Sequence, residues 1–154
     1  ELKKFEDVFV EIQVMNFNGK VLHDITTVPD GKTLEGSVKF APIEIENLLP
    51  NTDKNEIFLR LTLKDKNEKI IAQNIHFFSK PKDLKLTKPT IQIKKISSTE
   101  IEISTDILAK DVYLLGYTHF SDNFFDLLPG TSKRIKLSKP LDKVEVMSLF
   151  DTMN

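Results

Sequence analysis

Carboxylates are the most abundant reactive groups in this sequence, with 23 Asp and Glu residues among 154. Glycoside hydrolysis uses two of them on opposite sides of the bond that is cleaved, about 5 to 9 Å apart. Glu44 and Glu46, like Glu100 and Glu102, are spaced i, i+2 and would share one face of a strand. A catalytic acid also needs a pocket that shifts its pKa, and a small sheet domain offers little concavity. We therefore interpret both pairs as solvated sheet faces.

Histidine, cysteine and serine give no further catalytic or metal-binding pattern. His23, His76 and His119 lie far apart, and a metal site needs several converging ligands. His119 and Asp122 would supply two ligands without a third. There is no cysteine, which excludes disulfides, thiolate metal sites and a cysteine nucleophile. Neither a G-x-S-x-G motif nor a glycine-rich phosphate loop occurs, so we expect no catalytic residue, metal or cofactor.

The composition is that of an ordinary globular protein, with 40% hydrophobic and 29% charged residues. A net charge of -1 gives no basic field for a nucleic-acid backbone or a membrane surface. No apolar run approaches the roughly 18 residues of a membrane-spanning helix. We expect neither nucleic acid nor a membrane as a partner. Because the chain starts at Glu1 without a signal-peptide pattern, we interpret it as a processed protein or, preferably, as a fragment.

Alternation of apolar and polar residues with a period of two dominates the chain. It is clearest in residues 8–14, 57–64, 100–104 and 144–147, and it predicts strands with one apolar face. Asn18-Gly19 is typical of a two-residue hairpin in which both residues have positive φ, and Asp30-Gly31 is a second candidate. A polar turn is expected at 65–68. Short strands at this regular spacing predict a sandwich or a barrel.

Residues 80–89 are charged and bracketed by prolines, which fix φ and remove a ladder donor. This composition predicts an extended connector. We therefore expect two domains, residues 1–82 and residues 83–154.

The most distinctive segment is 120–130, which indicates a polar turn, a short strand and a Pro-Gly stop. In the strand, Phe125 and Leu127 share one face, while Phe124 and Leu128 share the other. Both faces are partly apolar, so the strand is expected to be buried on both sides or to face a second domain. The candidate interface residues are Asp122, Asn123, Phe124, Phe125, Asp126, Pro129 and Gly130.

This segment resembles the DN-aromatic-FDL-PG stretch in the C-terminal domain of glycoside hydrolase family 2 β-mannosidases. Residues 103–106, 109–114 and 148–151 resemble other strands of that domain, and residues 58–61 and 74–84 resemble the end of the preceding domain and its connector. One departure is Thr131, where the family often has Glu. The resemblance implies an all-β chain of two tandem immunoglobulin-like antiparallel β-sandwiches.

The resemblance also implies a role. In that family, two glutamates on a central (β/α)8 barrel hydrolyse terminal β-mannosides by a retaining mechanism. Such a barrel needs about 250 residues, so no catalytic residue is carried over to this chain. The implied function is a non-catalytic C-terminal accessory region, with the catalytic barrel and other parent domains as partners. A periplasmic or secreted parent enzyme is expected.

An independent carbohydrate-binding or cell-surface interaction module is the alternative, with mannan-type glycans as ligands. Such modules stack sugar rings on exposed Trp or Tyr. This chain has no Trp and only two Tyr, so the candidate sugar contacts are Tyr113 and Tyr117. The 11 Phe residues lie mostly in strand patterns and are interpreted as core.

Overall fold

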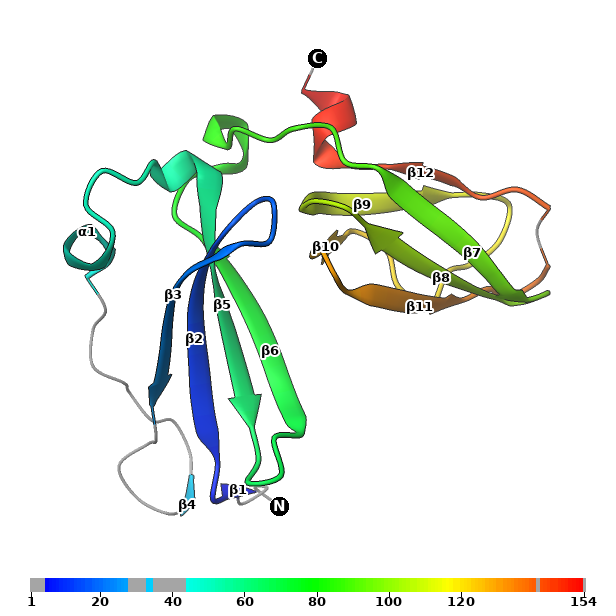
Figure 1. Ribbon diagram of the computed structural model, residues 1–154. Helices are drawn as coiled ribbons and strands as arrows, with labels where there is room; N and C mark the ends of the chain where they lie inside the picture. Colours follow the sequence, from blue (N-terminus) through cyan, green and yellow to red (C-terminus); the bar gives the residue numbers. More distant parts are fainter. Residues whose placement is uncertain (1–4, 28–32, 35–43, 141, 154) are drawn as a thin grey trace. The chain divides into compact units, whose positions relative to one another are not determined.

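A computed structural model describes residues 5–27, 33–34, 44–140 and 142–153 (Figure 1). Backbone contacts divide the chain into two compact units. The first comprises Glu1–Asn16 and Lys20–Asp83, and the second comprises Phe17–Gly19 and Leu84–Asn154. Within the described ranges the chain is all-β apart from short helical turns, and every strand pair is antiparallel. None of the helices in these ranges has the length and hydropathy needed to cross a membrane.

The first unit is built on a four-stranded sheet in the order β3-β2-β5-β6. Figure 1 shows these strands side by side, from dark blue β3 at one edge to green β6 at the other. Their bounds are β2 Phe9–Asn16, β3 Val21–Thr27, β5 Ile57–Lys64 and β6 Ile70–Phe77. Two short strands, β1 (Phe5–Glu6) and β4 (Thr33–Leu34), pair with each other. The strands predicted at 8–14 and 57–64 are confirmed.

One face of this sheet is apolar, as the alternation predicts. Val10, Ile12 and Val14 of β2 are buried, and Leu48 and Leu49 pack beside Val14 and Ile57. Leu48 ends a four-residue helix, α1 (Ile45–Leu48). The strand that we predicted around Glu44 and Glu46 is therefore wrong. Glu44 precedes α1, and its carboxylate accepts a hydrogen bond from the Asn47 amide, which favours a turn over an extended segment.

The turn between β2 and β3 is longer than predicted. β2 ends at Asn16 and β3 begins at Val21, so four residues separate the strands. Gly19 has φ 85°, whereas Asn18 is not among the positive-φ residues. The Asn16 side chain accepts a hydrogen bond from the Lys20 N–H at 2.9 Å. The predicted two-residue hairpin is wrong because only one left-handed residue, Gly19, is needed when the loop is this long. Asp30-Gly31 lies outside the described residues.

The predicted turn at 65–68 is confirmed. The Asp65 carboxylate accepts hydrogen bonds from the backbone N–H groups of Asn67 at 2.8 Å and Lys69 at 3.0 Å. Glu68 has φ 61°. The short side chain of Asp65 thus closes the turn between β5 and β6.

The connector begins with a single 3-10 turn, η2 (Pro81–Asp83), and residues 84–90 have no regular secondary structure. The absence of a ladder there agrees with the two prolines, which cannot donate to one. Leu84 is nevertheless buried.

The second unit consists of two three-stranded sheets, β10-β9-β12 and β11-β8-β7. Figure 1 shows them as two layers, with green β7 and orange β11 in one layer and β9 in the other. The bounds are β7 Ile91–Ser97, β8 Glu100–Thr105, β9 Ala109–Leu115, β10 Phe125–Leu127, β11 Ser132–Lys136 and β12 Glu145–Met147. A final 3-10 turn, η3, spans Leu149–Thr152.

The core of the second unit lies between its two sheets. Ile101, Ile103 and Ile135 come from one sheet, and Val112 and Leu114 come from the other. Each is nearly or fully buried, and burying such a side chain stabilises a fold by roughly 1.5–3 kcal/mol. The second unit is therefore a sandwich, the first of the two architectures that the strand spacing predicted.

Candidate functional site

The segment that carries the sequence motif crosses from one sheet of the sandwich to the other. Phe120 forms an isolated bridge with Leu137, and the Ser121 N–H donates to the Lys136 carbonyl at 2.9 Å. Five residues after Phe120, Phe125 begins β10 and pairs with Val112 of β9. Asp122, Asn123 and Phe124 therefore form a corner between the two layers. We call these three residues the crossover.

Asp122 ties the crossover to the β11-β8-β7 sheet. Its carboxylate lies 2.6 Å from the Lys133 Nζ on β11, and Lys133 also lies 4.6 Å from the centre of the Phe125 ring. The hydrogen bond from Lys133 is the main reason that the pKa of Asp122 lies below its usual value of 3.8, and partial burial opposes that shift. The Asn123 N–H donates to the same carboxylate at 2.8 Å.

Asn123 ties the crossover to the β10-β9-β12 sheet. Its Oδ1 accepts from the Leu114 N–H at 2.8 Å, and its Nδ2 donates to the Leu114 carbonyl at 3.1 Å. The side-chain amide therefore satisfies both backbone groups of a residue whose own side chain is buried. Buried backbone groups need such partners, so Asn123 replaces a missing neighbouring strand at this point of β9.

Phe124 turns the chain and is presented to solvent. Its φ is 58°, a left-handed value that costs a bulky side chain on the order of 1–3 kcal/mol. The side chain is 69% exposed, and its ring stacks on Tyr113 of β9 with the ring centres 4.5 Å apart and the planes tilted by 22°. A large apolar ring is thus presented on the surface, stacked on Tyr113, by a residue with a strained backbone.

Phe125 and Leu127 point the other way and belong to the core. Phe125 is 8% exposed. The predicted shared face of these two residues is confirmed. The predicted shared face of Phe124 and Leu128 is wrong, because Leu128 is buried whereas Phe124 is exposed. Leu128 lies one residue beyond the end of β10 at Leu127, so the alternation of a regular strand no longer sets the direction of its side chain.

Asp126 stabilises an irregularity in β9. The register shifts because Phe125 pairs with Val112 while Leu127 pairs with Ala109, which leaves Lys110 and Asp111 opposite Asp126. Such a bulge leaves a backbone group unpaired. The Asp126 carboxylate accepts from the Asp111 N–H at 2.8 Å and from the Lys110 Nζ at 3.2 Å. Asp126 therefore supplies a hydrogen-bond acceptor for the Asp111 N–H in the bulge.

Pro129 and Gly130 end the segment. Gly130 has φ 73° and no atom within 4 Å of the place where a Cβ would be. Its backbone conformation, not lack of space, therefore favours glycine. Thr131, which departs from the family pattern, donates its hydroxyl to the Leu128 carbonyl at 2.7 Å, so it makes a local turn contact of its own.

The two tyrosines do not form one flat platform. Tyr113 is stacked against Phe124, whereas Tyr117 is 91% exposed. Tyr117 borders a hollow of about 600 Å³ with Leu115, Gly116, Lys143 and Glu145. Lys143 and Glu145 form an ion pair at 3.2 Å. The candidate sugar contacts therefore lie in different settings.

The other residues with candidate chemistry occupy ordinary surface positions. Glu100 and Glu102 lie beside Arg134 of β11, at 3.9 Å and 3.7 Å, so this pair forms a charged sheet face as we interpreted it. His76 packs edge-on against Phe78, with the ring centres 5.5 Å apart. Within the described ranges, no three His, Cys, Asp or Glu side chains converge as metal ligands would.

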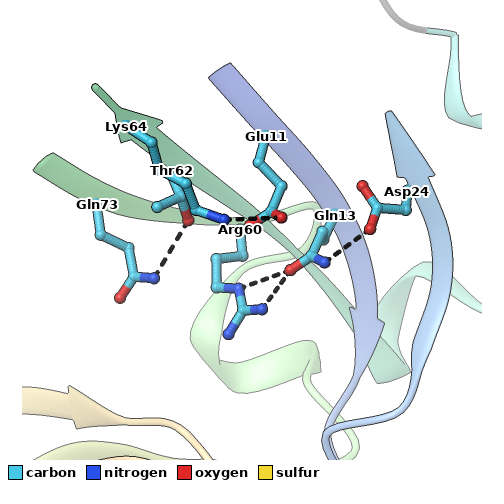
Figure 2. A network of polar contacts seen from close by, with 7 residues as sticks. All are labelled: Glu11, Gln13, Asp24, Arg60, Thr62, Lys64 and Gln73. Atoms are coloured by element: carbon cyan, nitrogen blue, oxygen red, sulfur yellow. Dashed lines mark hydrogen bonds and ion pairs between the residues drawn. The ribbon is translucent and has the colours of Figure 1, made fainter. Parts of the chain in front are cut away.

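A polar network on the first unit was not predicted from the sequence (Figure 2). Gln13 is 7% exposed in the middle of β2. Its amide nitrogen, Nε2, donates a hydrogen bond to the Asp24 carboxylate at 2.9 Å. Its Oε1 accepts hydrogen bonds from the Arg60 Nε at 3.0 Å and from a second Arg60 nitrogen. Lys64 pairs with Glu11 at 3.0 Å. Opposite charges are thus balanced across three strands, and the arrangement stabilises strand register without offering a reactive group.

Asp106 is a second polar anchor that the sequence did not reveal. Its carboxylate accepts hydrogen bonds from the Thr90 N–H and the Ile107 N–H, both at 2.8 Å. The hydrogen bonds from Thr90 are the main reason that the pKa of Asp106 is lowered. Asp106 therefore fastens the end of the connector, just before β7, to the turn between β8 and β9.

Comparison with known proteins identifies both units by family. The family model described as a mannosidase Ig/CBM-like domain matches residues 1–83, and the model of an Ig-fold domain named for mannosidases matches residues 81–152. Both sandwiches are thus immunoglobulin-like, as the resemblance implied. No curated protein matches the chain.

Two solved structures illustrate the likeness. A β-D-mannosidase from Dictyoglomus thermophilum is 25% identical with a TM-score of 0.56, and the match covers 96% of this chain and 19% of that chain. The exo-chitosanase CsxA from Amycolatopsis orientalis is 10% identical with a TM-score of 0.55, over 96% of this chain and 23% of that chain. The second match supports the fold alone. This chain spans less than a quarter of either relative.

Proposed function

This chain belongs to the mannosidase Ig/CBM-like domain family, and from that premise we propose that it is the non-catalytic C-terminal accessory region of a β-mannosidase of glycoside hydrolase family 2. Its role is to support the catalytic barrel of the parent enzyme. The parent hydrolyses terminal β-mannosides by a retaining mechanism. The observation that carries this proposal is the match of nearly the whole chain to 19% of a β-D-mannosidase.

The chemistry of the motif residues supports an accessory role. Asp122, Asn123 and Asp126 are the polar side chains of the motif, and each is engaged inside the second unit by Lys133, Leu114 and the Lys110–Asp111 bulge. A catalytic acid must instead face a substrate pocket. These residues hold the corner of a sandwich, which gives the unit a fixed outer surface for another domain.

The test uses the natural polypeptide that contains this chain. The full polypeptide is expected to hydrolyse p-nitrophenyl β-mannoside, while the 154-residue chain alone is not. Deleting the region that corresponds to these residues should shorten the half-life of activity on heating, because the barrel loses its support. The proposal fails if the purified chain alone turns over the substrate, or if the full polypeptide has no glycosidase activity.

A second candidate function is carbohydrate binding, favoured by the hollow beside Tyr117. An exposed aromatic ring next to Lys143 and Glu145 combines a surface for the apolar face of a sugar with a hydrogen-bond donor and an acceptor. Affinity electrophoresis through mannan gels distinguishes this function. Retardation that is lost in Tyr117→Ala would support it, and unretarded migration through several polysaccharides would remove it.

A further inference from the structure

The outer face of the β10-β9-β12 sheet carries three neighbouring apolar side chains. Tyr113 is in the middle, because its ring stacks on Phe124 and its Cα is paired with that of Met147 on β12. Val112, Leu114 and Val146 alternate with them and point to the core. We call Tyr113, Phe124 and Met147 the aromatic patch. Phe124 is 69% exposed and Met147 is 37% exposed, so the patch is open to a partner.

The patch is held in place before any partner binds. Phe124 is fixed by its left-handed backbone, by the stack on Tyr113, and by the two hydrogen bonds that join Asn123 to Leu114. The core of the sandwich gains nothing from a ring that lies outside it. Strained residues that are held by their surroundings are typical of binding surfaces, and a rigid side chain loses little conformational entropy when it binds.

The surroundings of Phe124 favour a protein surface over a sugar. A sugar ring needs hydrogen-bond partners for its hydroxyls around the aromatic platform. Here the neighbouring polar side chains are already used, since Asn123 is bound to Leu114 and Asp126 is bound to Asp111 and Lys110. Tyr, Phe and Met are the residues that protein interfaces enrich. An apolar pocket on another domain matches this chemistry.

We propose that the aromatic patch docks into an apolar pocket on the remainder of the parent polypeptide, with Phe124 as the anchor. This inference rests on the proposed function. The region that this chain matches is 19% of the β-D-mannosidase from Dictyoglomus thermophilum, so most of such a polypeptide lies outside these two domains and is available to cover the patch. Of the interface residues that the sequence predicted, Phe124 is the one that this surface retains, and Tyr113 and Met147 join it.

Thiol labelling tests the docking directly. The chain has no cysteine, so Phe124→Cys introduces the one thiol that these 154 residues contain. Ser98→Cys is the matched control, because Ser98 is exposed in the turn between β7 and β8 of the opposite sheet. In the full natural polypeptide, iodoacetamide followed by peptide mass mapping should label position 124 roughly tenfold or more slowly than position 98. In the 154-residue chain, the two positions should react at similar rates.

Equal labelling of position 124 in the full polypeptide and in the chain would overturn the inference. Protection of position 124 in the chain by mannan oligosaccharides, or by a higher concentration of the chain itself, would assign the patch to a glycan or to a second copy and would overturn it as well. The two failures are distinguishable. If the proposed function fails, the full polypeptide has no β-mannosidase activity; if only the docking fails, that activity is present and position 124 stays reactive.

Discussion

Asn123 acts at the scale of one residue, because a single amide satisfies both backbone groups of Leu114. Asn123→Ala leaves a buried donor and a buried acceptor without partners, so we expect it to lower the free energy of unfolding by roughly 1–3 kcal/mol. Urea denaturation measures this change. Asn67→Ala, at an exposed turn position, is the control and should stay within about 0.5 kcal/mol of wild type. A similarly small effect at position 123 would contradict the role assigned to the amide.

Asp122 makes the stability of the folded chain depend on pH, and the direction of this dependence can be predicted. Its pKa is lowered in the folded chain, mainly by Lys133, so the folded state favours the carboxylate. This contribution is fully present above the ordinary value of 3.8 and is lost as the pH falls through the lowered pKa. Asp122→Asn should therefore melt below wild type at pH 7, and the two melting temperatures should converge as the pH falls below about 4. A difference that stays constant with pH would contradict the prediction.

β10 begins at the second of two neighbouring phenylalanines, the exposed Phe124 and the buried Phe125. Phe125→Ala removes a core side chain and should cost roughly 3–5 kcal/mol of unfolding free energy. Phe124→Ala in the 154-residue chain removes an exposed ring and should cost less than about 1 kcal/mol. Thermal and urea unfolding of both variants measure the contrast. Equal losses would mean that the Phe124 ring contributes to the core, contrary to its exposure.

The pairing of β2 with β5 gives a second prediction for an element. Gln13 and Arg60 face each other across these strands and are joined by hydrogen bonds to the buried Gln13 Oε1. A double-mutant cycle of Gln13→Ala and Arg60→Ala should show a coupling energy of roughly 0.5–3 kcal/mol. The exposed pair Lys143 and Glu145 is the control and should couple by no more than about 1 kcal/mol. A coupling energy between Gln13 and Arg60 as small as that of the control pair would contradict a stabilising role for the network.

The positions of the strands were predictable from the sequence, whereas the geometry of the crossover between the two sheets was not. The alternation around Leu61 and Ile103 depends only on one covered face, so the sequence alone reveals it. The outcome for Phe124 and Phe125 depends on the crossover between two sheets, where Asn123 meets Leu114 of β9 and Asp122 meets Lys133 of β11. The Gln13–Arg60 contact joins residues 47 positions apart. The local pattern of apolar and polar residues does not show which residues of two distant strands lie opposite each other.

At the scale of the whole molecule, the ladders and the core of each unit are self-contained. β2, β3, β5 and β6 pair only among themselves in the described residues, and so do the six strands from β7 to β12. The buried cluster that contains Phe125 likewise draws its members from Ile101 to Leu137. Cooperative units of this kind open with their own free energies. A core mutation in one unit should therefore act mainly on the amides of that unit.

Hydrogen exchange followed by mass spectrometry measures this separation. Phe125→Ala should speed exchange throughout β7 to β12 and leave β2, β3, β5 and β6 close to wild type, because the members of its core cluster belong to the second unit. Val14→Ala, in the core of the first unit, is the reciprocal variant and should show the opposite pattern. If either substitution speeds exchange equally in all these strands, the two sandwiches unfold as one. The two units would then form one cooperative unit of unfolding, contrary to the separate ladders and core clusters.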